Sequence, residues 1–229
     1  MDVDIWSDIA CPWCYVGKRH LEAALEGFEH RDRVTVRWHS FELDPQAPPE
    51  REGDNAGNLA RKYGTSREQA VEMLDRMTAL AAEDGLEFHF ESARSGNTFD
   101  GHRIIHLALE HGCQDAMKER LMRAYLSEGE LISDHGTLRR LAIEVGLPAD
   151  EVDALLSGDR FAEEVRTDEY TASRLGITAV PFFVVDRTFG AAGAQPAEQL
   201  VEMLRRAWDA RPELSVAAPA GETCGPEGC

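Results

Sequence analysis

The stretch "SDIACPWCYVG" (residues 7–17) carries two cysteines, Cys11 and Cys14, that are separated by two residues. It follows "VDIWSD" (3–8), whose β-branched and aromatic residues are typical of a strand, and it begins a segment in which apolar residues recur at helical spacing. Pro12 suits the first turn of that helix, because an N–H there would have no partner within the helix. The sequence therefore predicts a strand-to-helix junction that holds both cysteines.

The rest of the chain predicts an α/β pattern built around this junction. Residues 33–41 alternate between apolar and polar side chains and predict a second strand. Strand character returns at 180–186 and again after the turn that follows, and 196–210 predict a final amphipathic helix. The order β-α-β, helices, β-β-α predicts a thioredoxin-like core with a large all-helical insertion. The helices expected in the middle of the chain are 57–63, 66–84, 97–111, 114–128, 135–145, 148–156 and 160–175.

This pattern also predicts how the chain is divided. Residues 1–44 and 161–212 are expected to form the thioredoxin-like domain, with 45–160 as the helical insertion subdomain. Within the insertion, "LEFHFE" (86–91) is expected as a short extended piece that lies against the second strand. Residues 213–229 are rich in Pro, Gly and Ala and are expected to form a flexible tail that carries cysteines.

The 229 residues carry a formal net charge of -18. Such a chain lacks the clustered basic surface that nucleic-acid binding requires. No apolar run approaches the roughly 20 residues of a membrane span, and the first residues lack the basic and apolar regions of a signal peptide. We therefore expect a cytoplasmic protein without nucleic-acid or membrane partners. In that compartment a cysteine pair is more often catalytic than structural. The oligomeric state is left open by the sequence.

The position of the cysteine pair favours redox chemistry. A helix N-terminus presents unpaired N–H groups and a positive dipole end, which would stabilise a thiolate and lower the pKa of Cys11. Cys14, one turn further on, could then close a disulfide after Cys11 attacks a substrate. The alternatives are half of a zinc site, for which the spacing supplies no second pair of ligands, or two packed thiols. Asp8 either raises the pKa of Cys11 by its charge or lies in solvent at the strand end.

A second feature lies far along the chain. "GITAVPFF" (176–183) places Val180 and Pro181 directly before a predicted strand. In a thioredoxin-like fold a cis proline here faces the cysteine pair and leaves the preceding backbone free to bind an extended substrate. A trans proline at the start of an edge strand is the alternative. With the cysteine pair upstream, we favour the cis peptide bond.

The stretch "NTFDGHRIIH" (97–106) supplies further candidates. Asn97 or Thr98 suits a helix cap, and the other residues suit packing inside the insertion. Alternatively, Asn97, Phe99 and His102 line a groove above Cys11, where a histidine can move protons. A metal site is the third alternative, because His102 and His106 share a helix face, but spacing identifies no further ligand.

These segments, together with "GAAGAQP" (190–196), resemble the DsbA-like thioredoxin superfamily, and within it the FrnE-type branch of predicted dithiol-disulfide isomerases. "CPWC" and "AVPFF" are the most diagnostic parts of a resemblance that runs along almost the whole chain. The resemblance implies that Cys11 is the nucleophile, that Cys14 is the resolving cysteine, and that Val180 and Pro181 form a substrate-binding cis-proline loop. It also implies a turn near the substrate groove at 193–196.

Other residues complete the predicted site. Pro12 stiffens the motif, and Trp13 is expected to be exposed and to contact the substrate. Cys224 and Cys229 of "CGPEGC" are close enough in sequence to pair. The resemblance favours an accessory redox pair that relays electrons, and the alternatives are thiols without function or a soft-metal site.

The leading hypothesis is a thiol–disulfide oxidoreductase or isomerase that acts on a disulfide-containing protein or a low-molecular-weight thiol. It requires no metal or cofactor beyond its redox-active disulfide, with glutathione as a possible co-substrate. The second hypothesis is a glutathione-dependent transferase or isomerase, because the superfamily includes kappa-class transferases and 2-hydroxychromene-2-carboxylate isomerases. Those relatives generally carry Ser in place of the first cysteine, unlike this chain. A third is a non-enzymatic binding module whose cysteines form a structural clip. The physiological substrate and the direction of electron flow are not predicted.

Overall fold

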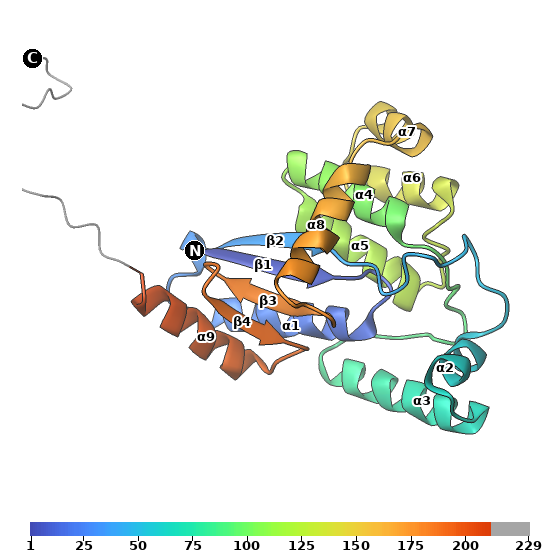
Figure 1. The fold of residues 1–229 in the computed structure, drawn as a ribbon, viewed down its shortest axis with the longest axis horizontal. Coiled ribbons are helices and arrows are strands. Elements are labelled where there is room, and N and C mark those ends of the chain that lie inside the picture. Colours follow the sequence, from blue (N-terminus) through green and yellow to red (C-terminus); the bar gives the residue numbers. More distant parts are fainter. Residues whose placement is uncertain (212–229) are drawn as a thin grey trace, which may run out of the picture.

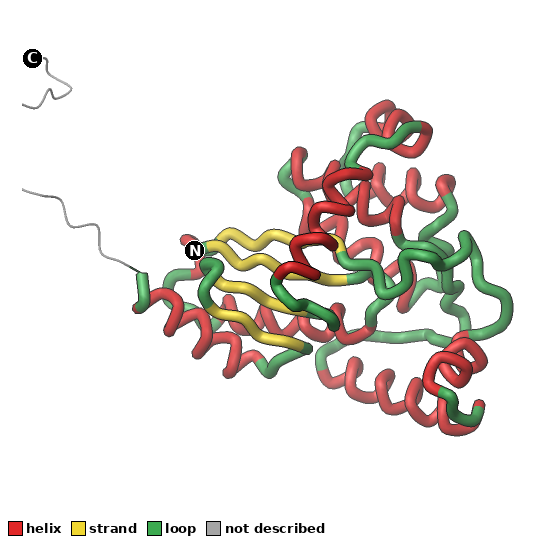
Figure 2. The backbone as a smooth tube through the Cα atoms, viewed as in Figure 1, coloured by secondary structure: helices red, strands yellow, loops and turns green. Residues whose placement is uncertain are grey.

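A computed structural model of the chain describes residues 1–211 and contains a mixed four-stranded sheet with helices around it (Figures 1 and 2). The strand order is β2-β1-β3-β4, where β1 and β2 are parallel and the other neighbours are antiparallel. The strands are β1 (Asp2–Ser7), β2 (Thr35–Ser40), β3 (Phe182–Val185) and β4 (Phe189–Ala192). This confirms the predicted α/β class and the order β-α-β, helices, β-β-α.

The helices also follow the prediction closely. They are α1 (Pro12–Glu26), α2 (Asn55–Tyr63), α3 (Arg67–Glu83), α4 (Phe99–Glu110), α5 (Gln114–Leu126), α6 (His135–Glu144), α7 (Ala149–Ser157), α8 (Ala162–Arg174) and α9 (Ala197–Asp209). Each predicted boundary of these helices lies within a few residues of the observed one, because glycines and capping residues mark the ends in the sequence. Ser66, for example, forms a full capping box with Gln69 at the start of α3.

The core of the sheet joins residues that are distant in the sequence. Ile5 in the centre of β1 lies opposite Trp38 on β2 and Phe183 on β3. All three side chains are almost completely buried. Helix α1 packs against α9, while α8 crosses the front of the sheet in Figure 1 and contacts β2. Burial of these apolar surfaces is the main force that fixes the carboxyl end of β1 beside α1.

Helices α4 and α5 of the middle region pack against each other, and α5 also contacts β2. One face of α5 buries every residue of an i, i+3, i+4 series, and this row is Gln114, Met117, Lys118, Leu121, Met122 and Tyr125. A helix of the insertion is therefore part of the layer that covers the end of the sheet where the cysteines lie.

The short extended piece expected at 86–91 does not join the sheet. Residues 86–91 form no strand and do not pair with β2. Instead His89 donates its backbone N–H to the carbonyl of Leu126 at the end of α5 (2.8 Å), and the Phe88 ring packs beside Tyr15 of α1, with 6.0 Å between centroids. The alternation arises because Phe88 is buried against helices, an environment that periodicity alone does not distinguish from a sheet. In the part of the chain described, no helix combines the length and apolar character of a membrane span.

Candidate active site

The two cysteines lie where β1 gives way to α1. Cys11 is the N-cap residue with extended backbone angles, and Pro12 begins the helix. Cys14 donates its backbone N–H to the Cys11 carbonyl at 3.0 Å, so the two residues belong to one helical turn. Both are free thiols in this structure, with 5% of Cys11 and none of Cys14 exposed. Cys14 is thus the more deeply buried of the two residues.

The Val180–Pro181 peptide bond is cis, in agreement with the sequence-based prediction. The Cys11 thiol donates to the carbonyl oxygen of Val180, with 3.7 Å between sulfur and oxygen. Gly17 of α1 makes this approach possible, because a Cβ atom added there would lie 2.9 Å from Cγ of Pro181. A residue with any side chain would therefore force α1 and the proline apart.

Two buried polar groups lie on the inner side of the cysteine pair. The ammonium group of Lys118, from α5, is fully buried and donates to the carbonyl oxygen of Ser7 at 3.0 Å. The Ser7 hydroxyl is also buried, and among residues 1–211 it has no hydrogen-bond partner of ordinary geometry. It lies near the Cys14 thiol. Lys118 is near enough to both cysteines to interact with their charges.

Asp8 completes this side of the site and is 2% exposed, so it does not lie in solvent. Its carboxylate accepts hydrogen bonds from the backbone N–H groups of Leu43 (2.7 Å) and Ala10 (3.3 Å), and Nε2 of His102 lies 3.4 Å from it. Burial alone would raise the pKa of Asp8, but these hydrogen bonds and the Lys118 charge hold it below its ordinary value. We call Ser7, Asp8, His102 and Lys118, together with Cys11 and Cys14, the redox cluster.

The two thiols shift each other's pKa values in opposite directions. The hydrogen bond between the two sulfurs and burial raise the pKa of Cys11 well above its ordinary value, and the charge of Asp8 adds to this. Burial also disfavours the Cys14 thiolate, but the Cys11 thiol, Lys118 and Ser7 together lower the pKa of Cys14. These opposite directions arise from one shared hydrogen bond and describe the pair as a whole, so the low pKa expected for Cys11 itself stays a prediction.

Burial also changes the pKa values of the two basic residues near the cysteines, Lys118 and His102. Burial lowers the pKa of Lys118 to about 8 and also lowers that of His102, whose protonation the nearby Lys118 charge opposes. His102 is 1% exposed and contacts the carboxylate of Asp8, so it is not a surface residue above Cys11. The sequence identified the residue, but it lies beneath the site and not in an open groove.

The predicted substrate-contacting residues fall into two groups. Trp13 is 46% exposed beside the cysteines, as expected, and Pro12 is half-buried. Asn97 accepts a hydrogen bond from the backbone N–H of Phe99, the first residue of α4, at 2.8 Å, while the N-cap residue itself is Thr98, whose side chain makes no capping hydrogen bond. The Phe99 ring lies under the guanidinium group of Arg166, with 4.4 Å to the ring centroid, at the side of α8.

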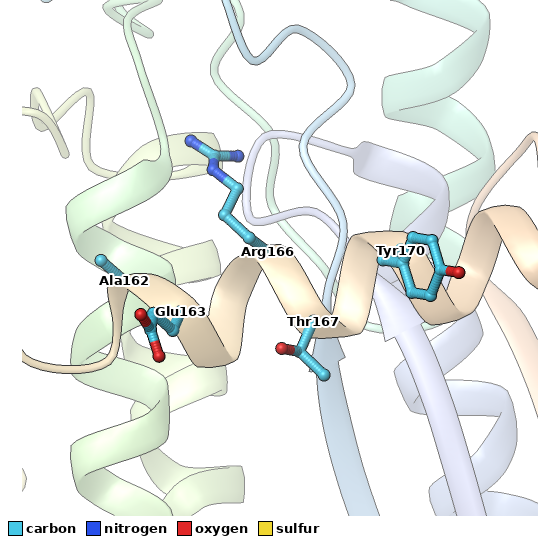
Figure 3. Close-up of a pocket in the computed structure, with 5 residues that line it drawn as sticks. All are labelled: Ala162, Glu163, Arg166, Thr167 and Tyr170. Carbon is cyan, nitrogen blue, oxygen red and sulfur yellow. The ribbon is translucent and has the colours of Figure 1, made fainter.

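A surface hollow of about 440 Å³ lies along α8, and its lining includes none of the predicted site residues. Figure 3 shows Glu163, Arg166, Thr167 and Tyr170 projecting from successive turns of this helix. Beside it, Glu42 is buried and pairs with Arg166 at 2.6 Å, and burial raises the pKa of Glu42 to about 7. The backbone connects this carboxyl to the site, because the next residue donates the N–H that binds Asp8.

A second group of buried polar residues lies along the β2 edge of the sheet. His39 bridges Asp168 (2.7 Å) and Asp4 (2.8 Å), and His106 reaches the other oxygen of Asp168 at 3.1 Å. We call Asp4, His39, His106 and Asp168 the edge cluster. Within residues 1–211 no group of three or more His, Cys, Asp or Glu side chains has the arrangement of a metal site, so the metal alternative for His102 and His106 finds no support.

Sequence reasoning missed Lys118 and Glu42. The signal for Lys118 was present, since the helical repeat of α5 places this lysine among apolar residues of one face. For Glu42 no such signal exists, because its burial depends on α8 packing over the end of β2. The predicted accessory pair, Cys224 and Cys229, lies outside the described residues.

Comparison with known proteins agrees with this geometry. Residues 2–205 match the family described as DSBA-like thioredoxin domain. The chain is 45% identical to a probable DsbA oxidoreductase from Streptomyces coelicolor whose crystal structure superimposes with a TM-score of 0.91, covering 100% of this chain and 98% of that one. The protein YwbO of Bacillus subtilis (strain 168) is 28% identical over 206 residues, 87% of this chain and 94% of the relative. The cytosolic disulfide reductase DsbM from Pseudomonas aeruginosa shares the fold at 20% identity, with a TM-score of 0.61 over 90% of this chain and 100% of DsbM.

Proposed function

The chain belongs to the DsbA-like thioredoxin family of thiol–disulfide oxidoreductases, and from that premise we propose that Cys11 and Cys14 exchange disulfides with a protein or low-molecular-weight thiol substrate in the cytoplasm. The finer assignment to the FrnE-type branch and an isomerase activity are part of this proposal, which rests on the "CPWC" and "AVPFF" segments. Glutathione is proposed as the co-substrate. DsbM, which shares the fold, has been solved with glutathione.

One observation carries the proposal, namely that Cys11 lies between the cis-proline loop and the second thiol. Its thiol touches the carbonyl of Val180 next to a cis proline, and its own helical turn holds the second thiol behind it. A substrate that extends along Val180 would bring a disulfide sulfur to Cys11, and the exposed Trp13 ring would cover the apolar part of that substrate.

The charges of the pair indicate how attack begins. The hydrogen bond between the two sulfurs and burial raise the pKa of Cys11, so its proton must be removed before it can attack. We infer that Cys11 gives up its proton to solvent as a substrate disulfide arrives. Cys11 then attacks one substrate sulfur, the substrate S–S bond breaks, and the first substrate thiolate leaves and takes a proton from solvent. Cys14 loses its proton in turn and attacks Cys11, which releases the second substrate thiolate and leaves a protein disulfide.

This proposal predicts complete dependence on the first cysteine. Cys11→Ser is expected to abolish reduction of insulin disulfides by glutathione, a loss of at least a thousandfold. Cys14→Ser is expected to accumulate a mixed disulfide between Cys11 and the substrate, because the resolving thiol is absent. The mixed disulfide can be detected by mass spectrometry of the intact protein.

Cys113→Ala is the matched control, because this partly buried thiol lies outside the site and should not affect exchange. Retention of disulfide exchange in Cys11→Ser would contradict the proposal. Conjugation of glutathione to an aromatic electrophile that survives in Cys11→Ser would support instead the transferase or isomerase alternative.

A further inference from the structure

One histidine of α1, His20, joins three parts of the molecule that are distant in the sequence. Its Nδ1 lies 2.8 Å from the carbonyl oxygen of Gln195, in the turn between β4 and α9. Its Nε2 lies 3.1 Å from Oδ2 of Asp84, the C-cap residue of α3, and in Figure 1 the end of α3 lies beside α1. The ring therefore connects the helix that carries the cysteines with the end of the sheet and with the helical insertion.

The turn that His20 contacts also holds Pro181. Gly193 donates its backbone N–H to the carbonyl oxygen of Pro181 at 2.8 Å, and Gln195 donates its own N–H to the carbonyl oxygen of Gly193 at 2.9 Å. Because the Gln195 carbonyl can only accept, Nδ1 of His20 donates the third hydrogen bond of this series. A continuous series of hydrogen bonds thus leads from α1 to the proline beside the redox pair.

Helix α1 contacts the same proline directly, on the face that carries His20. Gly17 lies three residues before His20, and a Cβ atom added there would lie 2.9 Å from Cγ of Pro181. The proline is therefore held from two points of one helix. Close packing at Gly17 limits how near it lies to α1, and the hydrogen bonds that begin at His20 keep the turn behind it from moving away.

Asp84 gives the His20 ring one orientation. Oxygen atoms that accept hydrogen bonds lie at both ring nitrogens, whereas a ring turned over by 180° would present carbon atoms to them. Within residues 1–211, Asp84 is the carboxylate that pairs with His20, and the two side chains are 25% and 22% exposed. A pair with this exposure contributes little to stability, so orientation of the ring is its main effect.

We propose that His20 is a positioning residue that holds the Val180–Pro181 loop in place for polypeptide substrates, and that Asp84 orients its ring. The inference rests on the proposed function, because an extended substrate would bind along the same loop. It adds that the helical insertion acts on this loop through Asp84. It also names the substrate class, since a loop that binds backbone serves a polypeptide and not a small disulfide without a peptide backbone.

The test compares two disulfides, insulin and bis(2-hydroxyethyl) disulfide, that the full chain reduces with glutathione. His20→Phe keeps a ring of similar size and removes both nitrogens. We expect its KM for insulin to rise about tenfold while kcat stays within about twofold, because the cysteines are unchanged. Its kcat/KM for the small disulfide should stay within about twofold, because that substrate has no backbone to bind. His20→Asn keeps a donor near the position of Nδ1 and should restore most of the affinity for insulin.

Two further variants test the orienting carboxylate and the specificity of the effect. Asp84→Ala should raise KM for insulin about threefold, and it should add nothing to His20→Phe, in which the ring that it orients is absent. His111→Gln is the matched control, because His111 forms a similarly exposed pair with Glu151 at 3.2 Å between α4 and α7. Reduction of both disulfides should be unaffected in this control.

An unchanged KM for insulin in folded His20→Phe would overturn the proposal. An equal loss toward both disulfides would also overturn it, because it would indicate general damage to the cysteine pair. An unchanged KM in Asp84→Ala would overturn the orienting role, and it would overturn the whole proposal where His20→Phe does not fold. The proposed function fails separately, if the unmodified chain reduces neither disulfide.

Discussion

His102 and His106 lie one turn apart on α4, yet they belong to two clusters with opposite electrostatics. In the edge cluster, short hydrogen bonds join His39 to two carboxylates, and Asp168 is held by two histidines. In the redox cluster, His102 lies 3.4 Å from Asp8, and Lys118 has no ion pair within the described chain. The first cluster has its charges matched within itself. In the second, Lys118 makes no ion pair with a described carboxylate, and the charges that act on it are those of the two cysteines and Asp8.

The difference shows what distinguishes a structural group of buried charges from a functional one. The matched charges raise the pKa of His39 to about 9 in spite of burial, so its cationic form belongs to the folded state. Burial instead lowers the pKa of Lys118 to about 8 and lowers that of His102. Groups that are left unmatched respond when a neighbour gains or loses charge, and such shifts are common at catalytic sites.

The largest effect is expected from a substitution of Asp168 in the edge cluster. Asp168→Asn keeps the size of the side chain but leaves protonated His39 with one carboxylate fewer, and we expect unfolding to become easier by about 3 kcal/mol. Disulfide exchange should be unchanged, because the edge cluster contains neither cysteine. Urea unfolding and insulin reduction measure the two effects. Glu164→Gln, at an exposed position on the same helix, is the control, and equal stability of the two variants would remove the distinction between the clusters.

The second largest effect is expected in the pH dependence of stability, to which the two clusters contribute with opposite signs. Although burial opposes it, Asp168 and Asp4 raise the pKa of His39 from 6.5 to about 9, so the folded state binds this proton more tightly than the unfolded state does. The stability from protonated His39 is fully present below pH 6.5 and is lost as pH rises through 9, with a decrease of about 2 kcal/mol between pH 6.5 and pH 8.5. Lys118, whose pKa is depressed from 10.5 to about 8, acts with the opposite sign, since stability is recovered as pH rises from 8 to 10.5.

Denaturant unfolding at pH 6.5, 7.5 and 8.5 measures this slope. His39→Gln should remove most of the decrease, while Lys118→Met should leave it in place. A slope that persists in His39→Gln would assign the titration to another group.

The smallest expected effect concerns Gly17, which allows α1 to pack closely against Pro181 beside the redox cluster. A Cβ atom at this position would lie 2.9 Å from Pro181 and 3.3 Å from the Phe183 ring, so Gly17→Ala should cost about 1 kcal/mol of stability. Displacement of Pro181 should also lower kcat/KM for insulin reduction by about tenfold. Gly27 lies at the end of the same helix, and a Cβ atom added there would make no contact closer than 3.7 Å. Gly27→Ala should therefore lower neither the stability nor kcat/KM. If Gly17→Ala changes stability alone, Pro181 does not position the substrate.

Much of this architecture could be predicted because its determinants are local. Glycines and caps marked the helices, and the alternation at 33–41 marked β2. The cysteine pair and Pro181 could be placed opposite each other because their positions before and after the insertion match the ends of one sheet. The extended piece at 86–91 was mispredicted because apolar residues pack against helices as readily as against strands.

The charge distribution of the site could not be predicted in the same way. A helix N-terminus favours a thiolate at Cys11 when no other charge is near. The helical repeat of α5 marks Lys118 as buried, but it does not show that this lysine lies beside the cysteines. This lysine is more than a hundred residues from Cys11 along the chain, and its position depends on how α5 packs against β2. The burial of Glu42 could not be predicted either, because it requires α8 to pack over the end of β2. Long-range packing decides these pKa values, and no local pattern reports it.

The stacking of Trp6 on His39, with 4.6 Å between ring centroids, has an optical consequence. A protonated imidazole quenches indole fluorescence, so the emission of Trp6 should brighten as the edge cluster loses its proton. Trp13, placed between the two cysteines, is quenched in turn when they form a disulfide. With Trp38 and Trp208 replaced by phenylalanine, the chain would carry two intrinsic fluorophores, of which one reports protonation of the edge cluster and the other reports the oxidation state of the redox pair.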